Sequence, residues 1–414
     1  MINNRVKPEL LAPAGDLEKL KIAVLYGADA VYIGGEAYSL RAKAKNFDYE
    51  KMKEGIKFAH DHGVKVYVTA NIYAHNNDFK GMAEYFKEVE SAGADAILIS
   101  DLGVFSVAKE AVPNMEIHVS TQANNTNYMS ANMWYNLGAK RVVVARELSL
   151  KEIKEIREKI PADMEIEAFV HGAMCISYSG RCLLSNYLTG RDANKGACAH
   201  PCRWKYYLVE ENREGEYMPV EENERGTYIY NSKDLCMLNH IPDLVESGVE
   251  SFKIEGRMKT PFYVGTVIKA YRQAIDDYFE DPEKYEKRIP YYFEEISKAS
   301  HRDYTTAFYY GKPGGEEQVY TSNTYIRNYD FIGMVKEDYD PETGCAIVEQ
   351  RNKFEVGEEI EVMPAKGEPF KMVVEKMWND KGEEITSAPH PQQILKVKFT
   401  QPVKEFDMRR KAVK

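Results

Sequence analysis

Eight short β-rich runs alternate with helical stretches over the first 280 residues of this chain. Most of these runs are nearly continuous in apolar residues, which is typical of parallel strands that are covered on both faces. The longer segments between them, such as residues 16–26, 49–62 and 150–160, have the apolar spacing of amphipathic helices. The expected strands are residues 9–13, 30–34, 64–70, 96–100, 116–121, 141–146, 165–170 and 251–255.

This alternation predicts an α/β fold, namely a (β/α)8 TIM-like barrel formed by residues 1–280. Several helical stretches end at a Gly-Ala or Gly-Val step, as at Gly27 and Gly63, where glycine can take the left-handed conformation that ends a helix. An open doubly wound sheet is the alternative fold. It is less favoured because no G-x-G-x-x-G motif follows the first strand.

One connection in the predicted barrel is far longer than the others. Roughly 80 residues separate the seventh strand from the eighth, and connections of that length are commonly functional. We assign residues 172–248 to a cysteine-rich insertion. Because the loops that follow the strands form the catalytic face of such barrels, the insertion should lie at that face.

The pattern changes after the last predicted helix of the barrel, residues 260–278. Residues 281–320 form a tyrosine-rich connector, and from residue 321 onward short strands are separated by turn signals. Residues 321–414 therefore predict a small C-terminal antiparallel β-barrel domain. The basic tail, residues 408–414, is expected to be a solvated chain end, with a phosphate contact as the alternative. The expected strands are residues 331–335, 345–349, 358–362, 370–378 and 394–399.

Four of the six cysteines lie close together, with the spacing C-x6-C-x15-C-x3-C. They are Cys175, Cys182, Cys198 and Cys202. The first residues lack the features of a signal peptide and no apolar run is long enough to span a bilayer, so we expect a cytoplasmic protein with no membrane partner. Disulfides are rare in the cytoplasm, and clustered thiols there indicate metal binding or catalysis.

Two kinds of metal site are compatible with this cysteine cluster. Zinc sites usually pair C-x2-C knuckles, which neither the x6 nor the x3 spacing matches well. An iron–sulfur cluster tolerates looser spacing, because four thiolates only need to converge on a compact core. Unrelated buried thiols are the structural alternative, and such dense clustering in a cysteine-poor chain argues against it.

Basic and aromatic residues are interspersed among the cysteines. Arg181, Arg191 and Arg203 could offset the negative charge of a thiolate-bound cluster, or they could bind an anionic substrate. Arg203, Trp204 and Lys205 combine positive charge with an aromatic ring, a pattern suited to an unpaired base beside a phosphate, although an aromatic-rich core edge explains it equally well. The formal net charge of −10 decides little, because a local basic patch on an acidic protein can still bind phosphates.

Charged residues lie at the ends of three predicted barrel strands. The candidates for catalysis are Arg146, His171, Lys253, Glu255 and Arg257. We expect all five at the barrel mouth, where charged residues commonly serve catalysis and an arginine can hold a carboxylate bidentately. A ring of salt bridges that closes the top of the barrel is the structural alternative. His118 and Gln122, at the end of the fifth strand, are weaker candidates.

At this point several segments match a known family. EAFVHGAMCISYSGRCLLS (167–185) resembles the signature of the collagenase-like peptidase family U-32 at every fixed position. Further resemblances are ELLAPAGD (9–16), GADAVYIGG (27–35), GACAHPCRW (196–204) and FKIEGRMK (252–259). The similarity covers essentially the whole chain, including the C-terminal β domain that is typical of longer members.

The resemblance implies an iron–sulfur enzyme that hydroxylates RNA without oxygen. In characterised members that hydroxylate tRNA, ribosomal RNA or ubiquinone, four cysteines hold a [4Fe–4S] cluster. Carried over by motif, Cys175, Cys182, Cys198 and Cys202 become the ligands, and Cys236 is a candidate substitute for one of them. The layout is most similar to members that form 5-hydroxyuridine at the wobble position of tRNA, which implies tRNA as the partner and prephenate as the small anionic co-substrate. The resemblance does not identify the electron donor.

Other functions stay open. Some members carry a peptidase or collagenase label, but this sequence has no H-E-x-x-H motif and no G-x-S-x-G elbow. Cysteines committed to a metal cluster are also not free to act as nucleophiles. Hydroxylation of ribosomal RNA and a non-enzymatic iron–sulfur scaffold would each use the same cysteines. The sequence therefore argues against proteolysis without excluding it, and leaves the RNA substrate undecided.

Overall fold

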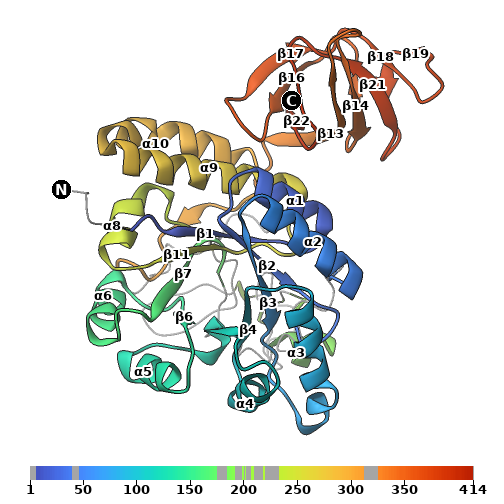
Figure 1. Cartoon of the computed structure of the whole chain (residues 1–414). Coiled ribbons are helices and arrows are strands. Elements are labelled where there is room, and N and C mark those ends of the chain that lie inside the picture. Colours follow the sequence, from blue (N-terminus) through green and yellow to red (C-terminus); the bar gives the residue numbers. More distant parts are fainter. Residues whose placement is uncertain are drawn as a thin grey trace.

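The structure of the chain, a computed structural model, describes residues 6–39, 46–174, 184–191, 198–199, 201, 207–208, 218–219, 233–311 and 325–413. Eight parallel strands close into a barrel in which the last strand, β11, pairs with both the first and the seventh (Figure 1). The strands are β1 (Glu9–Pro13), β2 (Ala30–Gly34), β3 (Lys65–Ala70), β4 (Ala96–Ile99), β5 (Glu116–Val119), β6 (Arg141–Val143), β7 (Glu165–Ala173) and β11 (Ser251–Ile254). The predicted barrel is confirmed, and each of its eight strands overlaps a predicted one.

Helices surround the barrel, and most of them begin at a residue whose side chain caps the first turn. Asp16, for example, accepts a hydrogen bond from the backbone N–H of Lys19, and Ser149 caps Glu152 in the same way. Glycines with positive φ end several helices as predicted, including Gly63 at φ 73°. The helices are α1 (Leu17–Leu25), α2 (Tyr49–Asp61), α3 (Met82–Ser91), α4 (Leu102–Ala111), α5 (Tyr128–Asn136), α6 (Leu150–Lys159), α8 (Ile241–Glu246) and α9 (Pro261–Glu280). None of the helices in the described ranges has the length and apolar character that a membrane crossing requires.

The long connection after β7 contains regular structure in its described part. A short helix, α7 (Leu184–Thr189), follows β7, and β10 (Asp234–Cys236) returns antiparallel to β7. β12 (Tyr304–Thr305) then pairs with β10, so two short strands extend the sheet outside the closed barrel. The segment predicted as a connector contains a further helix, α10 (Pro282–Ser297), which lies beside α9 (Figure 1).

The C-terminal part is an antiparallel sheet that forms a half-barrel, drawn in orange to red in Figure 1. Its strand order runs β17-β16-β22-β13-β14-β21-β18-β19, and apolar side chains such as Phe354 and Val397 form its own core. The members are β13 (Tyr329–Asp340), β14 (Cys345–Gln350), β16 (Glu359–Met363), β17 (Phe370–Val373), β18 (Met377–Trp378), β19 (Glu384–Ile385), β21 (Ile394–Lys398) and β22 (Met408–Ala412); β15 (Phe354–Glu355) pairs with β20 (Ser387–Ala388) beside them.

The prediction of a solvated basic tail is wrong for residues 408–412. They form β22, which lies in the sheet between β13 and β16, and the side chains of Arg409 and Arg410 are fully buried. The prediction was based on the four basic residues of the tail, because charged chain ends are usually exposed to solvent. Arg410 is instead neutralised by two carboxylates, from Glu295 in α10 at 2.7 Å and from Glu361 in β16 at 2.5 Å.

The half-barrel packs directly against the barrel helices. The hydroxyl of Tyr26, at the end of α1, donates to the backbone oxygens of Met363 and Phe406, both at 3.0 Å. Met334 and Met408 belong to the same buried apolar cluster as the barrel core. The shared core joins the C-terminal sheet to α1 and α9, so the two parts form one packed structure.

Candidate active site at the barrel mouth

An ion pair lies at the C-terminal ends of β6 and β11. The Nη2 of Arg146 is 2.8 Å from Oε2 of Glu255, and both side chains are largely buried. The guanidinium of Arg146 also lies over the ring of Phe169, with its central carbon 3.9 Å from the ring centre, and its Nη1 donates to the backbone oxygen of Ala173 at 3.3 Å. Two candidates from distant parts of the sequence are therefore brought together, as expected for residues at barrel strand ends.

Arg257 lies near the ends of β2 and β3 and is held by neutral oxygen atoms. Its Nη1 donates to the hydroxyl oxygens of Ser39 at 2.7 Å and Thr69 at 3.1 Å, and its Nη2 donates to the side-chain oxygen of Asn46 at 2.8 Å. The guanidinium fits only because residue 34 is glycine, since a Cβ there would lie 2.0 Å from Nη2 of Arg257. Its bonding partners show that Arg257 is tightly positioned.

Lys253 lies deeper in the barrel than expected. Its Nζ is 2.6 Å from Oε1 of Glu167, and both side chains are buried. Arg141 contacts the other oxygen of Glu167 at 3.0 Å and continues to Glu9 at 2.6 Å. Burial disfavours ionisation of Glu167, but Lys253 and Arg141 outweigh it and lower the pKa of this carboxyl to about 2. These ion pairs form a buried network inside the barrel that reaches Glu9 at its N-terminal end, which differs from the alternative of a ring of salt bridges that closes the barrel top.

His171 does not face the mouth, and this expectation is wrong. Its ring packs against Tyr263 and Tyr271 of α9 and Tyr304 of β12, outside the barrel wall. The reason is an irregularity in the pairing of β7 with β11, where Lys253 pairs with Phe169 and Ile254 pairs with His171. One extra residue in β7 reverses the alternation of its side chains beyond that point. Burial lowers the pKa of His171 to about 3, so the ring is neutral at physiological pH.

Most of the cysteine-rich segment lies outside the described residues. That applies to Cys175, Cys182 and Cys202, and to Arg181, Arg203, Trp204 and Lys205. Cys198 is described and half-buried, and its backbone oxygen accepts a hydrogen bond from Nη2 of Arg191 at 3.4 Å. The next residue, Ala199, donates its N–H to the hydroxyl of Ser185 in α7 at 2.9 Å. These contacts place Cys198 beside the helix that follows the first two cysteines.

The two remaining cysteines are buried away from solvent. Cys236 lies opposite His171 in the β10–β7 pair, with its Sγ 3.9 Å from the hydroxyl oxygen of Tyr271. Burial raises the pKa of its thiol to about 12. Because a thiolate is the form that binds metal, Cys236 is poorly prepared to replace one of the four proposed ligands. Cys345 is buried at the start of β14.

A group of neutral polar residues at the mouth was largely missed from the sequence. We call Asn71, Ser120, Gln122 and Asn125 the amide cluster. Asn71 directly follows β3, Ser120 and Gln122 follow β5, and Asn125 pairs with Val144 just beyond β6. The signal that could have identified them is their place immediately after the barrel strands. Only Gln122 was considered, as a weak candidate.

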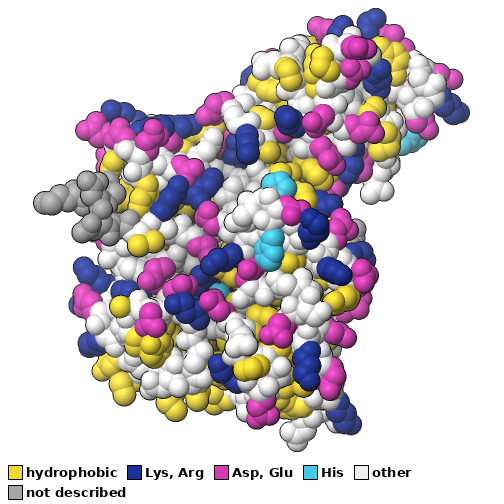
Figure 2. Space-filling model, viewed as in Figure 1, with side chains coloured by type: hydrophobic (Ala, Val, Ile, Leu, Met, Phe, Trp, Pro, Cys, Tyr) yellow, Lys and Arg dark blue, Asp and Glu magenta, His cyan; other side chains and the backbone are white. Residues whose placement is uncertain are grey.

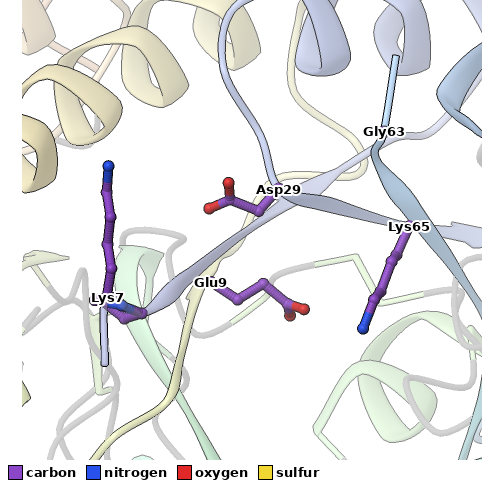
Figure 3. Close-up of a pocket in the computed structure, with 6 residues that line it drawn as sticks. Lys7, Glu9, Asp29, Gly63 and Lys65 are labelled. Atoms are coloured by element: carbon purple, nitrogen blue, oxygen red, sulfur yellow. The ribbon is translucent and has the colours of Figure 1, made fainter. Parts of the chain in front are cut away.

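The opposite, N-terminal end of the barrel holds a polar cleft of about 360 Å³. In Figure 3 the carboxylates of Glu9 and Asp29 lie between Lys7 and Lys65. Glu9 is also the outer end of the buried network, since its carboxylate contacts Arg141. Residues at this end of such barrels usually serve stability, which favours the mouth as the candidate active site.

Comparisons with known proteins agree with this architecture. The family model described as "Peptidase family U32" matches residues 15–319, and the model of the U32 C-terminal domain matches residues 327–410. The chain is 44% identical over 405 residues to tRNA hydroxylation protein P1 of Bacillus subtilis (strain 168), covering 98% of this chain and 95% of that protein. It is 38% identical to tRNA hydroxylation protein P of Escherichia coli (strain K12), covering 92% of each chain.

A third relative, a 23S rRNA 5-hydroxycytidine synthase of Escherichia coli (strain K12), is 36% identical over 273 residues. That match covers 66% of this chain but only 40% of the synthase. Both family models and the full-length matches agree with the resemblance found in the sequence motifs. The chain belongs to peptidase family U32.

Proposed function

We propose that this protein is an RNA hydroxylase that forms 5-hydroxyuridine at the wobble position of tRNA. The observation that carries the proposal is the match to tRNA hydroxylation protein P1 over nearly the full length of both chains. A match of that extent includes the barrel, the cysteine-rich insertion and the C-terminal sheet. A relative that shared only the barrel would support the fold but not the substrate.

The cofactor that we propose is a [4Fe–4S] cluster held by Cys175, Cys182, Cys198 and Cys202. Their spacing suits such a cluster, and they follow β7, whose end lies at the same face as Arg146. Replacing the C5–H bond of uridine by C5–OH is a two-electron oxidation of the base. The proposed co-substrate, prephenate, would donate the hydroxyl group and take up the displaced hydrogen, which balances the exchange, and a bound cluster would carry electrons for it. Arg191, which contacts the backbone of Cys198, would offset part of the negative charge of the thiolates.

Prephenate is the proposed co-substrate, and Arg146 is the residue that we assign to its carboxylate. The guanidinium lies over the ring of Phe169, and this contact restricts the direction of its N–H groups. The carboxylate of Glu255 pairs with one side of the Arg146 guanidinium, in the way that a carboxylate of the ligand would. We infer that Glu255 keeps Arg146 paired until the anionic ligand arrives and shares or replaces this contact.

The proposed contact with RNA depends on a local group of basic residues rather than on the net charge of the whole protein. The formal net charge is −10, and on the face shown in Figure 2 the Lys and Arg side chains are interspersed with Asp and Glu. Binding to tRNA would therefore depend on a limited basic surface, and Arg203, Trp204 and Lys205 are proposed to contribute to it.

The first experiment tests the cluster. Protein purified without oxygen should contain about four irons and four sulfides per chain and show the broad absorption of a [4Fe–4S] cluster. Cys175→Ala and Cys182→Ala should lose most of both, whereas Cys345→Ala, a cysteine in the C-terminal sheet, should keep them. A colourless wild-type protein that still hydroxylates RNA would reject the cluster.

The second experiment tests the substrate. A strain that lacks this protein should lose 5-hydroxyuridine from its tRNA, as measured by mass spectrometry of digested nucleosides, and the wild-type gene should restore it. The same digests report 5-hydroxycytidine in 23S rRNA, the product named for the third relative. Loss of the ribosomal modification alone would replace tRNA by ribosomal RNA, and cleavage of peptides with no change in either RNA would favour the peptidase alternative.

A further inference from the structure

The amide cluster contains buried hydrogen-bonding atoms that the protein leaves unused. Oδ1 of Asn71, Oε1 of Gln122 and both amide atoms of Asn125 have no hydrogen-bond partner within the described part of the chain, and Asn125 is only 1% exposed. Buried polar atoms in native proteins are nearly always paired, with protein, water or a ligand. Several such atoms in one place, at the catalytic face of the barrel, indicate a group that binds there.

The cluster is positioned by its own hydrogen bonds. Nδ2 of Asn71 donates to the hydroxyl oxygen of Ser120 at 3.1 Å, and this oxygen also accepts the backbone N–H of Gln122 at 3.4 Å. The hydroxyl of Tyr73 donates to the backbone oxygen of Gln122 at 2.5 Å. Asn125 accepts, through its backbone oxygen, the N–H of Ala145 at 3.0 Å. Hydrogen bonds therefore hold the main chain of the cluster in place, while its side-chain amides still have atoms that can form further hydrogen bonds.

The side chains that form hydrogen bonds with the cluster, among the described residues, are neutral. The side chains that bond to it or to its main chain are the hydroxyls of Tyr73 and Ser100, with Thr121 bonded to the adjacent Val144. The nearest charged candidate in sequence, Arg146, is paired with Glu255. A phosphate or carboxylate would need a cationic donor, so the ligand of the amide cluster should be an uncharged group that both donates and accepts hydrogen bonds.

We propose that the amide cluster binds the base of the target nucleotide and reads it as uracil. This inference rests on the proposed RNA hydroxylase function and names the residues that select its base. Uracil presents an N–H donor between two carbonyl oxygens, and a side-chain amide offers one acceptor and one donor group, which match an adjacent pair of these atoms. Recognition through that edge leaves the C5–H bond uncovered. The base has to leave its stack to reach the barrel mouth, as bases do in other enzymes that modify them.

The decisive variant is Asn125→Asp, which keeps the shape of the side chain but removes its donor group. A carboxylate accepts from the amino group of cytosine and repels the carbonyl oxygen of uracil. We expect kcat/KM for an anticodon stem-loop with uridine at the wobble position to fall by about 10–100-fold, and the preference for uridine over cytidine to shrink accordingly. Gln122→Met, which removes one amide, should lower the same preference and decides the question if Asn125→Asp does not fold.

The matched control is Asn127→Asp, the same change two residues away. Asn127 is exposed and caps α5 by accepting the N–H of Ser130, a role that Asp fills equally well. It should keep the wild-type preference. An unchanged uridine-to-cytidine ratio in Asn125→Asp and Gln122→Met, with iron content retained, would show that the cluster holds water only. A raised KM for prephenate with an unchanged ratio would assign the cluster to the co-substrate and equally overturn the proposal.

A binding measurement separates this proposal from the proposed function. The probes are stem-loops with uracil, cytosine or no base at the wobble position, bound to wild-type protein and to Asn125→Asp without turnover. If the wild type hydroxylates no RNA, the proposed function fails, but tighter binding of the uracil stem-loop that Asn125→Asp abolishes would still support the base site. Equal binding of all three probes by the wild type would reject it.

Discussion

The ammonium group of Lys253 lies 2.6 Å from a carboxylate oxygen of Glu167 in the interior of the barrel, where both side chains are buried. Arg141 contacts the other carboxylate oxygen, and Ser251 donates to both Glu167 and Glu9. Charges thus replace part of the apolar filling that barrels of this type usually have. Because each buried charge has an opposite partner, removing one of these charges should lower the free energy of unfolding more than removing one charge of an exposed pair does.

Glu167→Gln should lower the stability of the folded protein strongly. The change keeps the size of the side chain but leaves Lys253 and Arg141 with less negative charge around them, and breaking a buried pair of this kind costs about 3–5 kcal/mol. The unfolding midpoint in urea and the thermal midpoint should both fall. Glu155→Gln is the control, because Glu155 forms an exposed pair with Lys159 within α6 and should change little. Equal effects of the two variants would contradict the buried-network reading.

Arg146 should be irreplaceable by lysine if it holds the carboxylate of the co-substrate. Arg146→Lys keeps the positive charge but loses the planar fork and the stacking on Phe169, so we expect KM for prephenate to rise by about tenfold or more. Binding of the RNA stem-loop and the iron content should be retained. Arg327→Lys is the matched control, since Arg327 is half-exposed and pairs with Asp330 in the C-terminal part. An unchanged KM in Arg146→Lys would place the carboxylate elsewhere.

The barrel could be predicted from the sequence because its signals are local. Strands buried on both faces are continuous apolar runs, and caps and glycines mark the helix ends, as at Asp16 and Gly63. Strand β22 could not be predicted in the same way. Its sequence, Met408–Ala412, contains three consecutive basic residues, and only the carboxylates of Glu295 and Glu361, far away in the chain, make burial of Arg410 favourable.

The site was predictable in part for a similar reason. Strand ends place Arg146 and Glu255 at one face, and that step needs only the strand order. The direction of His171 depends on an irregular pairing between β7 and β11, which no spacing in the sequence reveals. The amide cluster was missed because asparagine and serine after a strand are ordinary turn residues, and what distinguishes them is burial without a partner.

Arg409 and Arg410 should respond in opposite directions to the same substitution. Both are fully buried neighbours in β22, but the three guanidinium nitrogens of Arg409 have no hydrogen-bond partner in the described structure, and its charge lies over the rings of Phe354 and Phe399. Arg409→Met should be neutral or stabilising, because a buried group without hydrogen bonds is replaced by an apolar one. Arg410→Met removes a buried cation from Glu295 and Glu361 and leaves them to share Lys298, so it should cost up to about 3–5 kcal/mol. Thermal midpoints of the two variants provide the comparison, and a large loss in Arg409→Met would indicate a partner that this structure does not contain.

His171 should make the protein sensitive to acid well before its carboxylates do. Burial lowers the pKa of the ring to about 3, whereas histidine in an unfolded chain titrates near pH 6.5. The unfolded chain therefore takes up a proton below about pH 6.5 that the folded protein does not bind until about pH 3. It follows that the stability contribution is fully present above pH 6.5 and is lost progressively as the pH falls toward 3.

His171→Phe should reduce this acid sensitivity, because phenylalanine can fill the space among Tyr263, Tyr271 and Tyr304 without a titrating group. The measurement is the urea midpoint of both proteins between pH 7 and 4. The curves should diverge below about pH 6.5, with the wild type losing stability faster. The pH range also separates His171 from Glu167, whose lowered pKa of about 2 makes its contribution fall only below about pH 4.5. Parallel curves for wild type and His171→Phe across this range would mean that the ring is not held neutral among the tyrosines.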